Sequence, residues 1–285
     1  MNSFWSKIIR RVSSLAKKPA IIDLRHVDDD TYFFNNRFHL SKMLPVANLP
    51  IERGITLPAF RLIGNECHPF VTALKDLGTS GQDMNDLNYL KSKMDIFYSN
   101  YQPSNAFDIL GLGDCSDHVL GSMEPYVLTL PWDNASPKQE RRAKRKSIMK
   151  ENKVLNVNLG ADAGWAWSGP VSAKKLHVEA RRLLNVFNSI RKNGYQRSDE
   201  PDGDIRVNIL FDGFLDTATW QSRVGQHRAL ALSSLGFNKI PCRISNFVVR
   251  TEVESWPNVR NGLYSKELAL SVFDNMFNLG QDKVP

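Results

Sequence analysis

The spacing of hydrophobic and polar residues is most regular in the C-terminal half of the chain. Hydrophobic residues recur at helical spacing over residues 172–193, which predicts an amphipathic helix with Ser172 as its N-cap. Alternating hydrophobic residues predict strands at residues 154–159 and 205–211, and a further short strand is expected at 219–224.

The N-terminal half has a less regular pattern. Short apolar runs at residues 20–24 and 56–63 alternate with turn signals, and residues 83–98 have helical spacing. Residues 138–153 are highly charged and have almost no apolar face, which predicts a solvated helical connector. We therefore expect four segments beyond residue 18: an N-terminal region of unknown role (19–137), the basic connector (138–153), a C-terminal domain (154–249) and a helical extension (250–285).

The strongest chemical signal is the sequence Val-Gly-Gln-His-Arg at residues 224–228, between a predicted strand and a predicted helix. A helix N-terminus presents unpaired backbone amides and the positive end of the helix dipole, which favour a phosphate group. Gly225 lets the backbone approach such a group, and Gln226 and His227 stand in the first turn. Arg228 can donate two hydrogen bonds to phosphate oxygens. The alternative is that His227 and Arg228 only solvate a helix start.

The surrounding sequence favours the phosphate interpretation. The stretches LLNVFNSIRKNGY and GQHRALALSSLGFNKIPCRI resemble the ParB/sulfiredoxin-like superfamily over about residues 155–249. The resemblance implies an α/β (α+β) fold, with a small mixed-sheet domain that follows an N-terminal α/β region of unrecognised fold. It also implies that ATP or another nucleoside triphosphate, with Mg²⁺, is held by the turn at residues 225–228 and by the helix that carries Ser172 and Arg182.

The branches of this superfamily differ in their chemistry. Sulfiredoxins have a cysteine at the second position of the turn, where this chain has Gln226, so sulfinate reduction is not expected. The chain beyond Ile244 is too short for the DNA-binding and dimerisation segments of ParB proteins. Free-serine kinases carry an aspartate before the glycine, and Val224 takes that place here. A catalytic carboxylate would therefore have to come from another position.

Three carboxylates are candidates for that role: Glu179, Asp212 and Asp216. One of them could accept the proton of a hydroxyl group or bind magnesium during phosphoryl transfer. The alternative for Glu179 is a surface ion pair with Arg182 three residues later, and Asp212 is equally well explained by its turn with Gly213.

These observations predict a nucleotide-dependent phosphotransferase of the kinase type. Its acceptor would be a small hydroxyl compound, such as a cell-envelope glycan or a lipid-linked sugar. A nucleotide-regulated nucleic-acid-binding protein and a non-catalytic scaffold remain alternatives.

The net charge of +7 is concentrated in two patches, at residues 1–18 and 138–153, and the rest of the chain is mildly acidic. The second patch could contact the phosphates of nucleic acid or lipid head groups, although a solvated face is more common. No apolar run has the length of about 20 residues that a membrane span needs, and the N-terminus lacks the features of a secretory signal. We therefore expect a cytoplasmic protein.

Residues 4–16 have an amphipathic and basic helical pattern. Such a helix can lie in a membrane interface, which would make the protein peripheral at the inner membrane face. The alternative is that the same apolar stripe packs on the protein's own body.

Overall fold

The chain is a mixed α/β protein built around one six-stranded mixed sheet. The computed structural model describes residues 19–57, 59–64, 66–80, 83–111, 118–154, 157–199, 203–213 and 218–281. The strands are β1 (Ile21–Asp23), β2 (Leu44–Pro50), β3 (Gly54–Ile55), β4 (Arg206–Phe211), β5 (Ala218–Val224) and β6 (Lys239–Val249). Their order across the sheet is β1-β2-β6-β4-β5-β3. The pairs β2–β6 and β4–β5 are antiparallel, and the other three are parallel.

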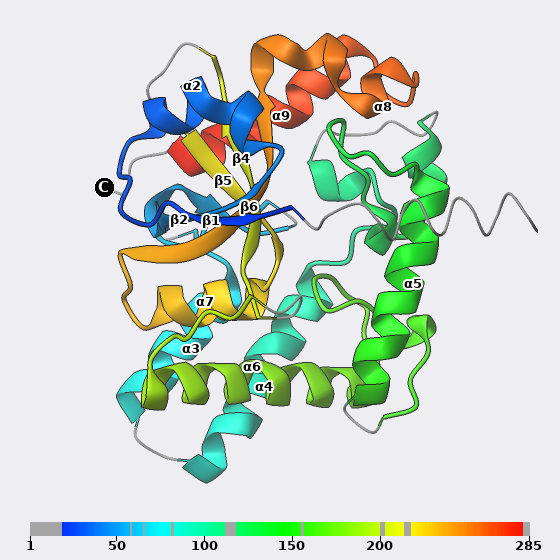
Figure 1. The fold of residues 1–285 in the computed structure, drawn as a ribbon. Coiled ribbons are helices and arrows are strands. Elements are labelled where there is room, and N and C mark those ends of the chain that lie inside the picture. The colour runs from blue at the N-terminus through cyan, green and yellow to red at the C-terminus, as the bar shows by residue number, and fades with distance from the viewer. Residues whose placement is uncertain are drawn as a thin grey trace, which may run out of the picture.

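Helices cover both faces of this sheet (Figure 1). One face carries α3 (Pro69–Ser80), α4 (Asp83–Asn100), α6 (Ala173–Asn193) and α7 (Gln226–Ser234). The other carries α9 (Lys266–Gln281), with the short α8 (Pro257–Arg260) beside it. The remaining α-helices are α2 (Asp30–Leu40) and α5 (Pro137–Val154). Six 3₁₀ helices complete the described elements: η1 (Ile51–Arg53), η2 (Asp108–Leu110), η3 (Val119–Ser122), η4 (Pro125–Val127), η5 (Ala161–Ala163) and η6 (Arg250–Ser255).

The central strands separate two hydrophobic cores. Val207, Ile209 and Phe211 of β4 point to the core under α6 and α7, whereas Leu210 points to the core under α9. Successive side chains of a strand face opposite sides of a sheet, so β4 is buried on both faces. This position explains why the hydrophobic pattern of residues 205–211 predicts the strand.

Strands from both halves of the chain form this single sheet. β1, β2 and β3 belong to the predicted region 19–137, and β4, β5 and β6 belong to the predicted domain 154–249. The halves pair at two places in the sheet. One is an antiparallel ladder between β2 and β6, in which Val46 pairs with Arg243 and Pro50 pairs with Lys239, and the other is the parallel pair of β3 with β5. The two segments therefore share backbone hydrogen bonds and a core.

The helix predicted at residues 172–193 is confirmed. Ser172 accepts a hydrogen bond from the amide of Lys175 at 3.2 Å, and Gly194 with φ 72° ends the helix. The strand predicted at residues 154–159 is wrong over the described residues. Val154 is the last residue of α5, and residues 157–159 belong to no strand, since the amide of Leu159 donates to the carbonyl of Val157 in a tight local turn.

The helix predicted at residues 138–153 is present as α5, and it packs on the body through Ile148. In the parts of the chain that the structure describes, no helix combines the length and apolar character needed to cross a bilayer. The amphipathic helix predicted at residues 4–16 lies outside the described residues.

Candidate functional site

The predicted strand-turn-helix around Gly225 is present. β5 ends immediately before Gly225, which has φ 81° and serves as the N-cap of α7. A Cβ atom added there would lie 2.8 Å from the carbonyl oxygen of Asp204 and 3.0 Å from Cα of Ile205. The amides of Arg228 and Ala229 both donate to the carbonyl of Gly225. A positive φ and a close backbone neighbour together explain the glycine.

Two of the three side chains in the predicted phosphate-binding turn point into the protein. Gln226 is 5% exposed, and its Oε1 accepts a hydrogen bond from the amide of Leu57 at 3.0 Å. His227 is also buried. Arg228 is partly exposed, and its Nη1 lies 3.5 Å from the carbonyl oxygen of Asp204. The solvent-facing part of the turn thus consists of the backbone at Gly225 and the guanidinium of Arg228.

Behind the turn lies a buried cluster of charged side chains from α6, with Glu179 at its centre. Glu179 is 0% exposed, and Lys175 beside it is 1% exposed. Lys175 Nζ lies 2.7 Å from Glu179 Oε1, Arg182 Nη1 lies 3.0 Å from Glu179 Oε2, and His227 Nε2 lies 3.6 Å from Glu179 Oε2. The structure therefore brings together Glu179, Arg182 and His227 from the predicted set and adds Lys175.

The predicted ion pair between Glu179 and Arg182 is present. Its predicted position on the surface is wrong, because Glu179 is fully buried. Burial raises the pKa of Glu179, and the nearby Arg182, His227 and Lys175 lower it by more, so the net direction is downward. Arg182 also contacts Glu151 of α5 at 3.2 Å. Arg182 therefore links the buried cluster on α6 to α5 through an ion pair. The spacing of three residues along one helix does not reveal how deeply that helix face is covered.

His227 carries no charge at neutral pH in this environment. Burial, and then the charge of Arg182, lower its pKa to about 4. Its ring packs against Trp167 with 4.9 Å between the ring centroids. Burial likewise lowers the pKa of His68 to about 3, and the His68 ring also contacts Trp167, with 6.2 Å between the centroids. His227 can therefore offer a hydrogen bond at this site but not a positive charge.

The two buried histidines make stability depend on pH. Each has a folded-state pKa below the value of 6.5 in an unfolded chain, so the unfolded state binds more protons as the pH falls. The free energy of unfolding is expected to decrease from about pH 6.5 down to about pH 4, by roughly 1.4 kcal/mol per pH unit for each histidine. Urea denaturation across this range measures the slope.

A histidine variant and a control separate this effect from general acid denaturation. His227→Gln should reduce the slope by the contribution of one histidine, whereas His39→Gln, at an exposed position of α2, should leave it unchanged. An unaltered slope in His227→Gln would contradict the assignment.

The structure does not bring Asp212 to the turn. Asp212 follows β4 and Gly225 follows β5, and because these strands are antiparallel, the two residues lie at opposite ends of the hairpin. A strand of this length spans about 20 Å. The hydrogen bond from Arg250 to Asp274 raises the pKa of Arg250, and the charge of Asp212 adds a smaller contribution in the same direction. Asp216 lies outside the described residues.

Asp204 is a carboxylate beside the turn that the sequence interpretation missed. Its carbonyl oxygen is the atom nearest to a Cβ added at Gly225, and its buried side chain forms ion pairs with Arg197 and Arg243. Burial raises its pKa despite these cations. One sequence signal could have found it: Asp204 directly precedes the strand that pairs with the strand leading into the turn.

Comparisons with known proteins add no assignment, because no family model, curated protein or solved structure matches this chain. The resemblance to the ParB/sulfiredoxin-like superfamily therefore stays a prediction.

Proposed function

We propose that this protein binds a nucleotide through its phosphate groups at the start of α7 and transfers a phosphoryl group from it to a small hydroxyl acceptor. The observation that carries the proposal is the geometry of the turn. Gly225 in the left-handed conformation starts a nine-residue helix, and Arg228 stands partly exposed in its first turn. Backbone amides, the helix dipole and a guanidinium all favour an anion at this point.

The buried cluster supports the same proposal from behind the turn. Arg182, whose side chain is 27% exposed, places a partly accessible positive charge on the helix that packs against α7, and Lys175 adds a buried charge beside Glu179. Phosphoryl transfer requires cations that offset the charge of the moving group. Glu179 holds these cations in place, and since it is fully buried and paired, we assign it a positioning role in this proposal.

In the proposed transfer step, one bond to phosphorus forms and one breaks. The acceptor's hydroxyl oxygen forms a bond to the γ-phosphorus, and the bond from that phosphorus to the bridging oxygen of the leaving diphosphate breaks. The hydroxyl proton passes to water, and a nucleoside diphosphate is released.

Mg²⁺ would accompany the nucleotide in this proposal. Among the described residues, no group of three His, Cys, Asp or Glu side chains could hold a metal ion. Magnesium in nucleotide sites is commonly bound by phosphate oxygens, water and one or two carboxylates, so such a group is not required. The Mg²⁺ requirement, like the cytoplasmic location, stays a prediction.

A second candidate function rests on the outer face of α5. Lys138, Arg142, Arg145, Lys146 and Lys150 are all exposed on this helix. A run of exposed cations favours nucleic-acid backbones, as in a nucleotide-regulated nucleic-acid-binding protein. Such binding should weaken steeply with salt and when these cations are neutralised, whereas phosphotransferase turnover should depend on Arg228.

A thermal-shift panel with ATP, ADP, CTP and GTP in the presence of Mg²⁺ tests nucleotide binding. A nucleotide at about 100 times its Kd should raise the Tm of the wild type by roughly 5 °C. Arg228→Ala should weaken binding about tenfold to a hundredfold, because it removes charge-assisted hydrogen bonds to phosphate.

Arg145→Ala is the matched control, since it removes an exposed arginine from the outer face of α5. It should leave the nucleotide shift unchanged. The absence of a shift with all four nucleotides would reject the proposal, and a full shift in Arg228→Ala would place the nucleotide elsewhere.

A further inference from the structure

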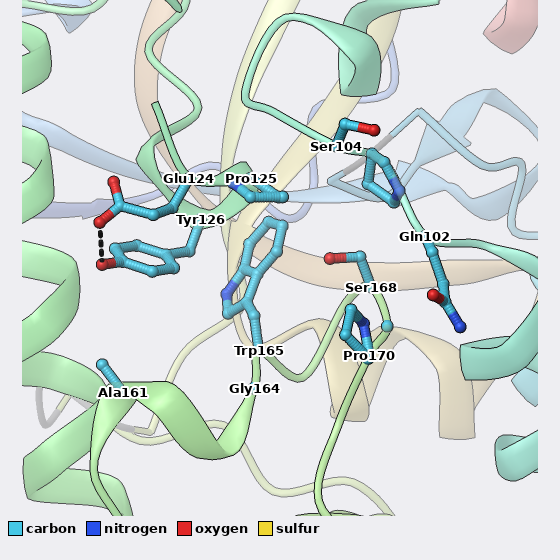
Figure 2. A pocket seen from close by; sticks show the side chains of 12 residues that line it. Gln102, Ser104, Glu124, Pro125, Tyr126, Ala161, Gly164, Trp165, Ser168 and Pro170 are labelled. Atoms are coloured by element: carbon cyan, nitrogen blue, oxygen red, sulfur yellow. Dashed lines mark hydrogen bonds between the residues drawn. The ribbon is translucent and has the colours of Figure 1, made fainter. Parts of the chain in front are cut away.

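A cleft of about 380 Å³ opens on the side of the 161–170 segment that faces η4 (Figure 2). Its walls come from residues 102–104, 124–126 and 161–170, which are far apart in the sequence. The residues that line it are Gln102, Pro103, Ser104, Glu124, Pro125, Tyr126, Ala161, Gly164, Trp165, Ser168, Gly169 and Pro170.

The lining combines aromatic rings with hydroxyl, amide and carboxylate groups. Figure 2 shows the indole of Trp165 between Tyr126 on one side and Ser168 on the other. None of the described residues that line the cleft is Lys, Arg or His. A phosphate or carboxylate ligand would thus meet no positive side chain in the lining, and the cleft favours an uncharged ligand with many hydroxyl groups.

Glu124 is the one charged residue among the described residues of the lining, and its side chain is 41% exposed. Its Oε1 accepts a hydrogen bond from the hydroxyl of Tyr126 at 3.1 Å, and its Oε2 accepts two from Arg141, one from Nε at 2.8 Å and one from Nη2. A carboxylate has about four acceptor sites. Glu124 is therefore held in a fixed orientation, and its Oε1 can still accept a hydrogen bond from a ligand hydroxyl.

The floor of the cleft is anchored to the C-terminal end of α4. The amide of Gly169 donates to the carbonyl of Tyr101 at 2.9 Å, and the hydroxyl of Tyr98 donates to the carbonyl of Ala166 at 2.9 Å. A Cβ on Gly169 would lie 1.8 Å from the carbonyl oxygen of Tyr98. Such close backbone contact indicates a preformed cleft, which lowers the entropic cost of binding.

The same turn connects the cleft to the candidate phosphate site. Trp165 and Ser168 form an isolated antiparallel bridge, and both line the cleft. Trp167, between them, packs against His227 in the first turn of α7. The turn at residues 165–168 thus lines the cleft through Trp165 and Ser168 and contacts the first turn of α7 through Trp167.

We propose that this cleft binds a neutral saccharide, with its hydroxyls bonded to Glu124, Ser104 and Gln102. Trp165 and Tyr126 are 7% and 8% exposed, so they offer the C–H groups of a sugar a small apolar surface, and the more exposed polar groups around them suit its hydroxyls. The further role of this saccharide as the phosphoryl acceptor rests on the proposed function. In that case a sugar hydroxyl takes the place of the acceptor hydroxyl in the transfer step.

Saturation-transfer NMR on the full chain tests this inference, with glucose, N-acetylglucosamine and maltotriose as neutral probes and glucose 6-phosphate as an anionic one. We expect at least one neutral sugar to bind the wild type, and its phosphorylated form to bind more weakly. Glu124→Gln should weaken binding about tenfold through loss of a charged acceptor. Ser104→Ala, at an exposed position, should weaken it by a smaller factor.

Glu254→Gln is the matched control, because Glu254 is an exposed carboxylate that does not line the cleft. It lies on η6 and forms an ion pair with Lys266 of α9. It should leave sugar binding unchanged. The inference is overturned if none of the neutral sugars binds, with or without ATP and Mg²⁺, or if both cleft variants bind as the wild type does.

The increase in Tm on addition of nucleotide, measured on the same samples, distinguishes the two proposals. If nucleotide raises the Tm but no sugar binds, only the saccharide cleft is rejected. If a sugar binds and Glu124→Gln weakens its binding, but no nucleotide raises the Tm, the cleft is supported and its role as an acceptor site is rejected.

Discussion

Glu179→Ala is expected to lower the free energy of unfolding by about 3–5 kcal/mol. The substitution leaves Lys175, which is 1% exposed, without its counter-ion inside the protein. It also removes one of the two carboxylates that contact Arg182. A buried charge that loses its counter-ion is costly, because the attraction that offset its lost hydration is removed. Urea denaturation at pH 7 measures the change.

Two further variants show whether burial is the cause. Glu254→Ala removes a carboxylate from an exposed ion pair and should change stability by less than about 1 kcal/mol. Replacing Lys175 and Glu179 together by Met and Leu should restore most of the lost stability, because both charges leave the interior. A loss below about 1 kcal/mol in Glu179→Ala would contradict the buried cluster.

Gly169→Ala is the second substitution with a large expected effect, a loss of about 3 kcal/mol or more. Its Cβ would overlap the carbonyl oxygen of Tyr98, and this neighbour is backbone that cannot rotate away. The clash would displace the turn that carries Trp165 and Trp167. Thermal and urea unfolding measure the loss, and the cleft of Figure 2 should lose sugar binding as well.

Gly78→Ala provides a control of the opposite sign. Gly78 lies within α3, and a Cβ there would lie 3.9 Å from the ring of Phe187, which is ordinary contact. Alanine has a higher helix propensity than glycine, so stability should rise by up to about 1 kcal/mol. Equal effects of the two substitutions would contradict the close approach at Gly169.

The sequence predicted those features that depend on nearby residues. The helix that begins after Ser172, the strand at 205–211 and the glycine turn at 225 each have a local signature, either a hydrophobic period or a capping or turn residue. The mixed α/β class, which the resemblance to a known superfamily implied, is confirmed. The strand predicted at 154–159 failed because a short apolar alternation does not show whether a neighbouring strand is available to pair with it.

The buried charges could not be predicted in the same way. Lys175 and Glu179 have the spacing of an exposed ion pair, and only the packing of α4 and α7 on α6 covers them. Likewise, Gln226 and His227 occupy a helix start that is normally solvated, but the amide of Leu57, far away in the sequence, lies against it. The shared sheet of the two halves is also a long-range property, set by the pairing of β2 with β6 and of β3 with β5.

The position of a bound nucleotide is the most direct test of the proposed function. Titration of the isotope-labelled protein with ATP and Mg²⁺, followed through backbone amide NMR signals, reports which amides sense the ligand. The largest changes are predicted at Gly225, Gln226, His227 and Arg228, since their amides surround the start of α7. Saturable changes confined to other parts of the chain, with these four amides unaffected, would contradict the phosphate site.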